Sequence, residues 1–223
     1  MPQAVIFDLD GTLLDTAPDF SLILNRLLQQ HERAEVSSTA IRSTVSAGAR
    51  ALVKLGFGLR DDDPMLEALM GEFLQLYSAQ IPQTQASLFD DIDMLITSLH
   101  AAGVPWGIMT NKARRFSEPL LSRFESFSTC SVLVCPDDVN ASKPDPKGIL
   151  HACAQLGLPP EQAVYVGDHP RDIEAAVNAN MPGIAVRWGY LPESGNIENW
   201  GAAWIADTPR ELTDYLLKTQ ANV

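Results

Sequence analysis

The sequence has little positive charge, few cysteines and no long apolar run. Its 223 residues carry 16 Lys and Arg against 28 Asp and Glu, a formal net charge of −12. Nucleic acids and anionic membranes attract proteins through basic surfaces, so we expect neither as a partner. No apolar stretch approaches the ~20 residues of a membrane-spanning helix. With 46% hydrophobic residues, the chain can instead bury a sizeable globular core.

The three cysteines are Cys130, Cys135 and Cys153. They form neither an even disulfide set nor a Cys-x-x-Cys pair, and no charged leader followed by an apolar segment opens the sequence. We therefore expect a reducing cytoplasm as the location. Cys130 and Cys135 flank SVLV, a run typical of a strand, and we interpret them as small buried hydrophobic residues rather than metal ligands.

Short apolar runs bounded by turn residues recur along the chain and predict strands. Helical periodicity lies between several of them, at 91–103, 147–158 and 172–180. This alternation predicts an α/β fold, a Rossmann-like three-layer sandwich with a mostly parallel sheet. The expected strands are AVIFD (4–8), VPWGIMT (104–110), SVLVC (131–135), AVYVGD (163–168), GIAVR (183–187) and the weaker AAWIA (202–206).

The alternation breaks between 16 and 85, where only helical patterns occur. We expect an inserted α-helical cap domain at 16–85 and a core domain formed by 1–15 and 86–223. An insertion after the first strand would lie above that strand's carboxyl end, where α/β proteins bind ligands. The apolar positions with helical spacing are Phe20, Ile23, Leu24, Leu27 and Leu28, then Met65, Leu66, Leu69, Phe73 and Leu76.

Acidic and polar residues stand at the ends of the expected strands. Asp8 and Asp10 follow the first strand, where Gly11 permits a tight turn and Thr12 offers a donor, and both are candidates for substrate binding. Carboxyl ends of parallel strands meet at one edge of a sheet, so residues from several strands are expected to share one crevice. The later ones are Thr110 and Asn111, Lys143 in SKPDP, and Asp168 and Asp172 in GDHPRD.

Such a cluster suits a magnesium site. Mg²⁺ prefers oxygen ligands and is often held by one or two carboxylates together with substrate phosphate oxygens. Asp8 and Asp168 would suit it, with Asp172 holding a metal-bound water. Asp172 also suits the start of a helix, where the dipole favours a carboxylate. The metal would remove the electrostatic objection to an aspartate attacking a phosphate dianion.

The same cluster can perform phosphoryl transfer. Attack by Asp8 on phosphorus would give an aspartyl-phosphate and divide hydrolysis into two displacements. Asp10 could protonate the leaving alkoxide and later deprotonate the attacking water. The Thr110-Asn111 segment would hold phosphoryl oxygens, while Lys143 would balance the charge on the nucleophile and the transferring group.

DLDGT, the TN at 110–111, the Lys143 segment and GDHPRD resemble, in order and spacing, the four motifs of the haloacid dehalogenase superfamily of phosphohydrolases. The resemblance covers essentially the whole chain, including the small helical cap after the first motif. It implies Asp8 as the nucleophile and Asp10 as acid and base. It also implies Mg²⁺ bound by Asp8, the backbone carbonyl of Asp10, and Asp168, with Asp172 in support. The role of His169, where the family often has a small polar residue, stays open.

Two groups within the superfamily are similar to this chain, and both act on a small phosphorylated metabolite. LDTAPD, TNKARRFSEPLL and VGDHPRDIEAAVNANM resemble phosphoglycolate phosphatases, which the sequence favours. CPDDVNASKPDP, VRWGY and NWGA resemble N-acetylmuramic acid 6-phosphate phosphatases of cell-wall recycling. Arg50 in SAGAR could bind a substrate carboxylate or sugar group, or could equally be an exposed arginine at a helix start.

Proteins with other activities use similar residues. A sugar phosphomutase would return the phosphoryl group to a sugar, require a bisphosphate activator and release little phosphate. Lys54 invites comparison with phosphonoacetaldehyde hydrolases, but these and the dehalogenases lack the second aspartate, so Asp10 argues against both. A signalling receiver shares the acceptor Asp, Thr and Lys and uses Mg²⁺, but is far shorter and has no helical cap. We expect a monomer or homodimer.

Overall fold

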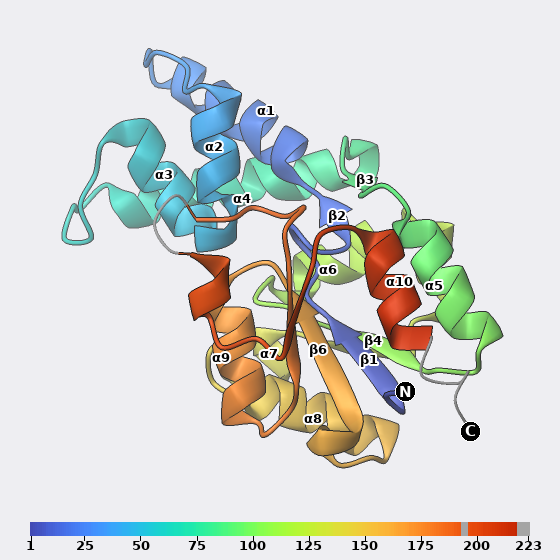
Figure 1. The fold of residues 1–223 in the computed structure, drawn as a ribbon. Coiled ribbons are helices and arrows are strands. Elements are labelled where there is room, and N and C mark those ends of the chain that lie inside the picture. The colour runs from blue at the N-terminus through green and yellow to red at the C-terminus, as the bar shows by residue number, and fades with distance from the viewer. Residues whose placement is uncertain (193–195, 218–223) are drawn as a thin grey trace.

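The computed structural model describes residues 1–192 and 196–217. At its centre lies a six-stranded sheet in the order β5-β4-β1-β6-β7-β8 (Figure 1). All of its strand pairs are parallel and each strand overlaps a run expected from the sequence, so the α/β prediction is confirmed. The strands are β1 (Ala4–Phe7), β4 (Trp106–Met109), β5 (Val132–Val134), β6 (Ala163–Gly167), β7 (Gly183–Val186) and β8 (Trp204–Ala206).

Helices cover both faces of this sheet, which explains why the central strands are apolar throughout. Val5 and Phe7 of β1 belong to the core beneath α5 and α10, whereas Ala4 and Ile6 belong to the core beneath α8 and α9. Successive side chains of a strand point to opposite faces, so β1 needs four apolar residues in a row. These helices are α5 (Ile92–Ala101), α8 (Lys147–Leu156), α9 (Pro170–Asn178) and α10 (Pro209–Leu217).

A second group of helices lies at the carboxyl ends of the strands. Figure 1 shows α1–α4 grouped beyond the end of β1 that is far from the N-terminus. The group is held by stacked aromatic rings, with Phe20 of α1 lying 4.9 Å from Tyr77 of α4 between ring centroids. Met65 was expected on the buried face but is 51% exposed, because α4 begins one residue later. The bounds are α1 (Ala17–Gln30), α2 (Ser38–Thr44), α3 (Ala49–Phe57) and α4 (Leu66–Gln80).

Two short connections join this group to the sheet. β2 (Leu14–Asp15) pairs antiparallel with β3 (Ser87–Leu88), so the chain enters and leaves the helical group side by side. Tyr190, which follows β7, donates its hydroxyl hydrogen to Asp15 at 2.7 Å and accepts from the backbone N–H of Thr16 at 2.6 Å. The outgoing connection is fixed by the buried Asp19, which accepts from the backbone N–H of Gln85 at 2.8 Å.

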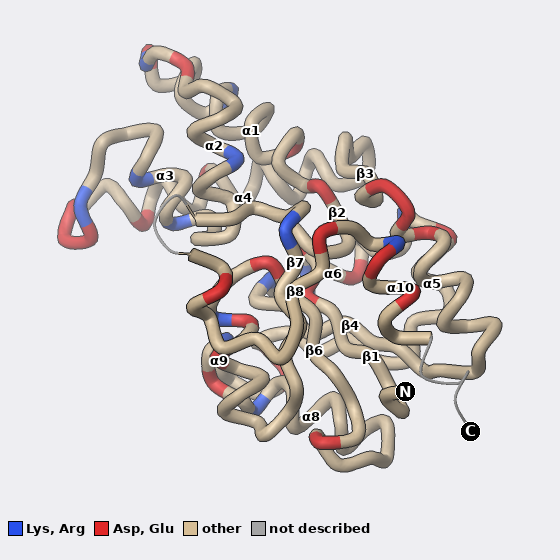
Figure 2. The backbone as a smooth tube through the Cα atoms, viewed as in Figure 1, with Lys and Arg blue, Asp and Glu red and all other residues tan. Residues whose placement is uncertain are grey.

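The remaining elements are short. They are α6 (Arg114–Leu121), α7 (Pro136–Val139) and the 3-10 helices at Val45–Ala47, Ile81–Gln83, Glu125–Thr129, Pro160–Gln162 and Ile197–Asn199. Figure 2 shows Lys and Arg scattered over separate helices and loops in the part of the chain that is described. None of the helices described there is long and apolar enough to cross a membrane.

Candidate active site

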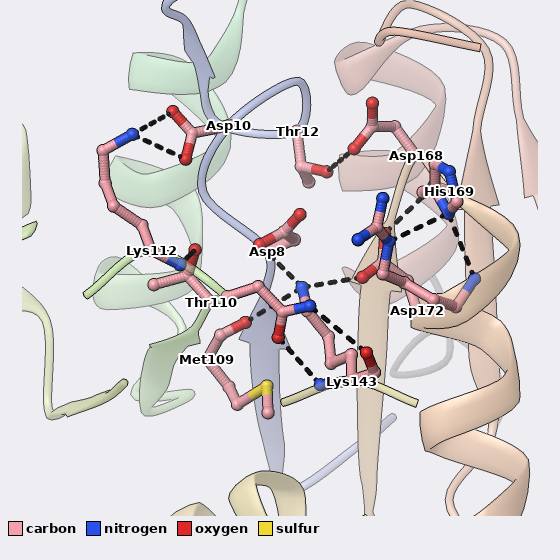
Figure 3. A network of polar contacts seen from close by, with 12 residues as sticks. Asp8, Asp10, Thr12, Met109, Thr110, Lys112, Lys143, Asp168, His169 and Asp172 are labelled. Atoms are coloured by element: carbon pink, nitrogen blue, oxygen red, sulfur yellow. Dashed lines mark hydrogen bonds and ion pairs between the residues drawn. The ribbon is translucent and has the colours of Figure 1, made fainter. Parts of the chain in front are cut away.

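The predicted strand-end residues meet at the edge of the sheet that faces α1–α4. Asp8 directly follows β1, and its backbone N–H donates to Val166 of β6 at 2.8 Å. Thr110 follows β4 in the same way and donates to Val134 of β5 at 3.0 Å. The parallel ladder thus continues one residue beyond each strand and fixes both side chains at the same level (Figure 3).

Lys143 is the cation at the centre of the cluster. Its Nζ lies 2.7 Å from Asp8 Oδ1 and 2.7 Å from Asp172 Oδ1 (Figure 3). It also donates to the Tyr165 hydroxyl at 2.9 Å. Burial opposes the charge of this ammonium, but the two carboxylates outweigh it and raise the pKa of Lys143. Lys143 therefore remains protonated and holds Asp8 in place.

Asn111 positions the loop that carries this lysine. Its side-chain Oδ1 accepts from the backbone N–H of Lys143 at 2.8 Å, while its Nδ2 donates to the carbonyl of Lys143 at 3.2 Å. The amide thus satisfies both backbone groups of one residue and fixes the loop against the end of β4. Asn111 therefore acts on the cluster by positioning Lys143.

Three carboxylates are gathered beside the lysine. One oxygen each of Asp8, Asp168 and Asp172 lies within 4.8 Å of the others. Burial, opposed by Lys143, raises the pKa of Asp8 to about 6. Burial and then the other two carboxylates raise the pKa of Asp168 to about 8. One ammonium thus leaves the negative charge of three aspartates incompletely balanced.

This donor set fits Mg²⁺. Hard oxygen ligands and spare negative charge are what that cation requires. Asp8 Oδ1 and Asp172 Oδ1 are buried, and both lie 2.7 Å from the same donor, the Lys143 ammonium. Asp10 was expected to supply its backbone carbonyl to the metal. Its side chain turns away from the other three, toward Lys112 (Figure 3).

Gly11 and Thr12 lie against Asp168. Gly11 has φ +88°, and a Cβ there would lie 2.2 Å from Asp168 Oδ2. Thr12 is fully buried and donates its hydroxyl hydrogen to Asp168 Oδ1 at 3.1 Å. Both residues therefore orient Asp168, and their part in substrate binding stays a prediction.

Asp10 has a cationic partner that the sequence analysis missed. Lys112 Nζ lies 2.8 and 2.9 Å from its two carboxylate oxygens, and Thr16 donates to Oδ1 at 2.7 Å. The ammonium also lies over the rings of Phe20 and Tyr77, at 5.0 and 4.8 Å from their centroids. The signal was available, because Lys112 directly follows the Thr-Asn pair at the end of β4.

His169 is held as a neutral imidazole. Its Nδ1 accepts from the backbone N–H and from Nε of Arg171, at 3.3 and 3.1 Å. Burial, assisted by the arginine charge, lowers the pKa of His169 to about 4. Its backbone N–H donates to Asp172 Oδ2 at 3.0 Å, and Arg171 donates in turn to the carbonyl of Ser46. This turn therefore joins the carboxylate cluster to the helical group.

A cavity of about 400 Å³ opens above the cluster. Its polar floor includes Asp8, Thr110 and Lys143, and its lining also comes from α1, α4, α6 and the segment before α3. The apolar wall is formed by Phe20, Leu74, Tyr77 and Phe116. The volume lies within the range that binds drug-sized ligands.

Arg50 is not among the residues that line this cavity. Its guanidinium pairs with Glu67 of α4, and both side chains are substantially exposed. Lys54 likewise pairs with Asp61 at 2.8 Å. These contacts favour the exposed arginine over the substrate contact, which stays a prediction.

Comparison with known proteins defines the class. Residues 5–186 match the family model described as haloacid dehalogenase-like hydrolase, and the chain belongs to that family. Among solved structures, a predicted phosphoglycolate phosphatase from Haemophilus somnus has a TM-score of 0.84 and 25% identity, covering 98% of each chain.

Proteins with similar sequences include two kinds of phosphatase. The chain is 44% identical to the N-acetylmuramic acid 6-phosphate phosphatase of Pseudomonas aeruginosa, over 96% of this chain and 94% of that one. It is 38% identical to the phosphoglycolate phosphatase of Xanthomonas campestris, over 95% of each. The protein is thus a phosphatase of small phosphorylated metabolites, as the sequence predicted.

Proposed function

We propose that the chain is a Mg²⁺-dependent phosphomonoesterase that acts through an aspartyl-phosphate and hydrolyses N-acetylmuramic acid 6-phosphate. The observation that carries this choice is the cavity of about 400 Å³ with its wall of aromatic and aliphatic side chains. A two-carbon acid would leave most of that space filled with water, whereas an N-acetylated sugar ring matches both its size and its apolar wall. The sequence favoured phosphoglycolate, and the cavity shifts that preference.

Asp8 is proposed as the nucleophile. Its carboxylate is fixed by Lys143, and it lies at the floor of the cavity. The same ammonium would offset charge on the phosphoryl group as the Asp8 oxygen approaches phosphorus. Thr110, also at the floor, would donate a hydrogen bond to a phosphoryl oxygen. The leaving sugar alkoxide departs as the Asp8–phosphorus bond forms.

Asp10 is proposed as the group that moves protons. It would donate a proton to the leaving alkoxide and then accept one from the water that hydrolyses the aspartyl-phosphate. Lys112 and Thr16 hold its carboxylate from the side of the helical group. These two contacts fix the position of the carboxyl group that takes part in both proton transfers.

Mg²⁺ is the proposed cofactor, held by Asp8 and Asp168, with Asp172 in support and the carbonyl of Asp10 as a further ligand. When bound, the ion supplies positive charge that favours approach of an anionic nucleophile to a phosphate dianion. Tyr190 and Thr12 orient Asp168 for this role, since the backbone N–H of Tyr190 donates to Asp168 Oδ2 at 2.7 Å.

We propose that 16–85 form a cap domain over a core domain of 1–15 and 86–223. The position of α1–α4 at the carboxyl ends of the strands supports this division, as does a cavity lined from both parts. The proposed location is the cytoplasm, supported by three free cysteines. The proposed partner is the phosphorylated metabolite alone, bound by a monomer or homodimer.

Phosphate release from a panel of esters tests the substrate. We would measure kcat/KM with Mg²⁺ for N-acetylmuramic acid 6-phosphate and 2-phosphoglycolate, and expect the amino sugar to be preferred at least about tenfold. A preference for phosphoglycolate would overturn the substrate assignment and leave the phosphatase chemistry intact. Little phosphate release from either ester, with activity appearing only on addition of a sugar bisphosphate, would instead identify a mutase.

A further inference from the structure

Four cationic side chains line the cavity, namely Lys112, Lys143, Arg115 and Arg171. Three of them already have a partner within the protein. Lys143 forms ion pairs with Asp8 and Asp172, and Lys112 forms one with Asp10. Arg171 donates a hydrogen bond to the carbonyl of Ser46. In the part of the chain that is described, the guanidinium of Arg115 has no carboxylate partner and no hydrogen bond, and contacts only the ring of Phe116, 4.6 Å from its centroid.

The position of Arg115 is fixed although its guanidinium is free. The residue lies in the first turn of α6, directly beyond the loop that carries Thr110 and Lys112. Its neighbour Arg114 fixes that turn, because Arg114 Nε donates to Asp138 Oδ1 at 2.8 Å and Nη2 donates to the carbonyl of Leu133 at 2.9 Å. Arg115 is exposed, so it lies at the rim of the cavity rather than at the floor.

Between the floor and this rim lies the apolar wall. Phe116 packs against Tyr77, with ring centroids 5.3 Å apart. The Tyr77 hydroxyl is buried near the Lys112 ammonium and forms no well-aligned hydrogen bond among the described residues. Its unused hydrogen-bonding capacity makes it a natural contact for a polar group of a ligand. From floor to rim, the cavity thus offers a phosphoryl site, an apolar wall with one polar group, and a free guanidinium.

We propose that Arg115 binds the carboxylate of a phosphomonoester substrate and selects carboxylate-bearing esters over neutral ones. Guanidinium and carboxylate form paired, charge-assisted hydrogen bonds, so an uncommitted arginine at the mouth of an acidic site is suited to this task. The inference rests on the proposed function and deepens it. Both candidate substrates carry a carboxylate. Because Arg115 lies at the rim and the phosphate would bind at the floor, Arg115 can reach only a carboxylate that is far from the phosphate. The lactyl ether arm of the amino sugar meets that requirement, whereas the glycolate carboxylate lies too close to its phosphate.

Two esters that differ only in the carboxylate-bearing group show whether Arg115 recognises that group. N-acetylglucosamine 6-phosphate has the same phosphorylated ring as N-acetylmuramic acid 6-phosphate but lacks the lactyl group. For Arg115→Met we expect kcat/KM to fall roughly 10- to 100-fold on the lactyl ester, chiefly through KM, and to stay within about threefold on the matched ester. Arg115→Lys should recover part of the loss. Arg123→Met is the matched control and should leave both values unchanged, because Arg123 is exposed and is not among the residues that line the cavity.

Equal losses on the two sugar esters with Arg115→Met would overturn the proposal, as would a selective loss with Arg123→Met alone. The same comparison is made with 2-phosphoglycolate and ethyl phosphate, which lacks the carboxylate. If Arg115→Met lowers kcat/KM only on 2-phosphoglycolate, the carboxylate that Arg115 binds is that of glycolate. A wild-type enzyme that prefers the carboxylate-bearing ester in neither pair would also contradict the proposal, although its phosphatase activity would stand. Failure to release phosphate from any of the four esters would instead refute the proposed function.

Discussion

Lys143 shows how a single residue controls this site. Its ammonium is 1% exposed and contacts two carboxylates that are themselves largely or fully buried. Two like charges this close in a buried setting repel one another, and the ammonium between them offsets that repulsion. The same two carboxylates raise the pKa of Lys143. The residue therefore serves both the stability of the cluster and the approach of an anionic substrate.

Replacing Lys143 by Met keeps much of its volume and removes its charge. We expect phosphate release to fall by about 10²- to 10³-fold, the usual effect of losing one electrostatic stabiliser. The free energy of unfolding should fall by about 3–5 kcal/mol, because two buried carboxylates lose their partner. Steady-state kinetics and urea unfolding measure the two effects. Lys147→Met, at an exposed lysine near Asp145, is the control, and equal behaviour of the two variants would contradict this role.

At the scale of elements, α6 and α7 are joined by Arg114 and Asp138. The Asp138 carboxylate accepts from Arg114 and also from the backbone N–H of Cys135, at 2.7 Å, which caps α7. The arginine, opposed by partial burial, lowers the pKa of Asp138. A carboxyl whose folded pKa is lowered contributes stability above its unfolded pKa, and that contribution is lost as the pH falls through the folded pKa.

Asp138→Asn should therefore destabilise the protein by about 1 kcal/mol at pH 7, a value kept small because the pair is partly solvated. The difference from wild type should narrow as the pH falls from 5 toward 3, where the wild-type carboxylate takes up its proton. Urea unfolding at several pH values measures both. A difference that stays constant over this range would exclude the ion pair as its cause, and Asp145→Asn provides an exposed control.

The elements also show what sequence patterns can predict. The six strands were predictable because each is a short, fully apolar run between turn residues. The β2–β3 pair was not, because two-residue strands have no periodicity to detect. In the site, the order of motifs predicted which residues gather at the strand ends. The partner of Arg50 could not be predicted, because Glu67 is brought to it by the packing of α3 against α4, whereas the place of Lys112 directly after Thr110-Asn111 was a signal for its contact with Asp10.

At the scale of the whole molecule, the buried carboxylate cluster would couple binding of the proposed Mg²⁺ to folding. A ligand that binds only the native state stabilises it by a free energy that rises with the logarithm of the ligand concentration relative to Kd. Asp8 follows β1, Asp168 follows β6 and Asp172 lies in α9, so the three gather only in the folded chain. The account therefore predicts that Mg²⁺ stabilises the entire protein, beyond any effect on turnover.

Thermal unfolding with EDTA and with saturating Mg²⁺ tests this coupling. We expect Mg²⁺ to raise the Tm of the wild type by several degrees, equivalent to about 1–3 kcal/mol. For Asp168→Asn the shift should largely disappear, while the Tm in EDTA should not fall much, since the variant also relieves repulsion among the carboxylates. An equal shift in both proteins would place the ion elsewhere.

The central claim is that Asp8 attacks phosphorus, and its removal provides the most direct measurement. Phosphate release from N-acetylmuramic acid 6-phosphate should be compared in wild type and Asp8→Asn, with Mg²⁺ present and with the fold checked by circular dichroism. The account predicts a folded variant whose kcat is at least about 10³-fold lower, because an amide cannot form the covalent intermediate. A folded variant that turns over at a near wild-type rate would contradict it.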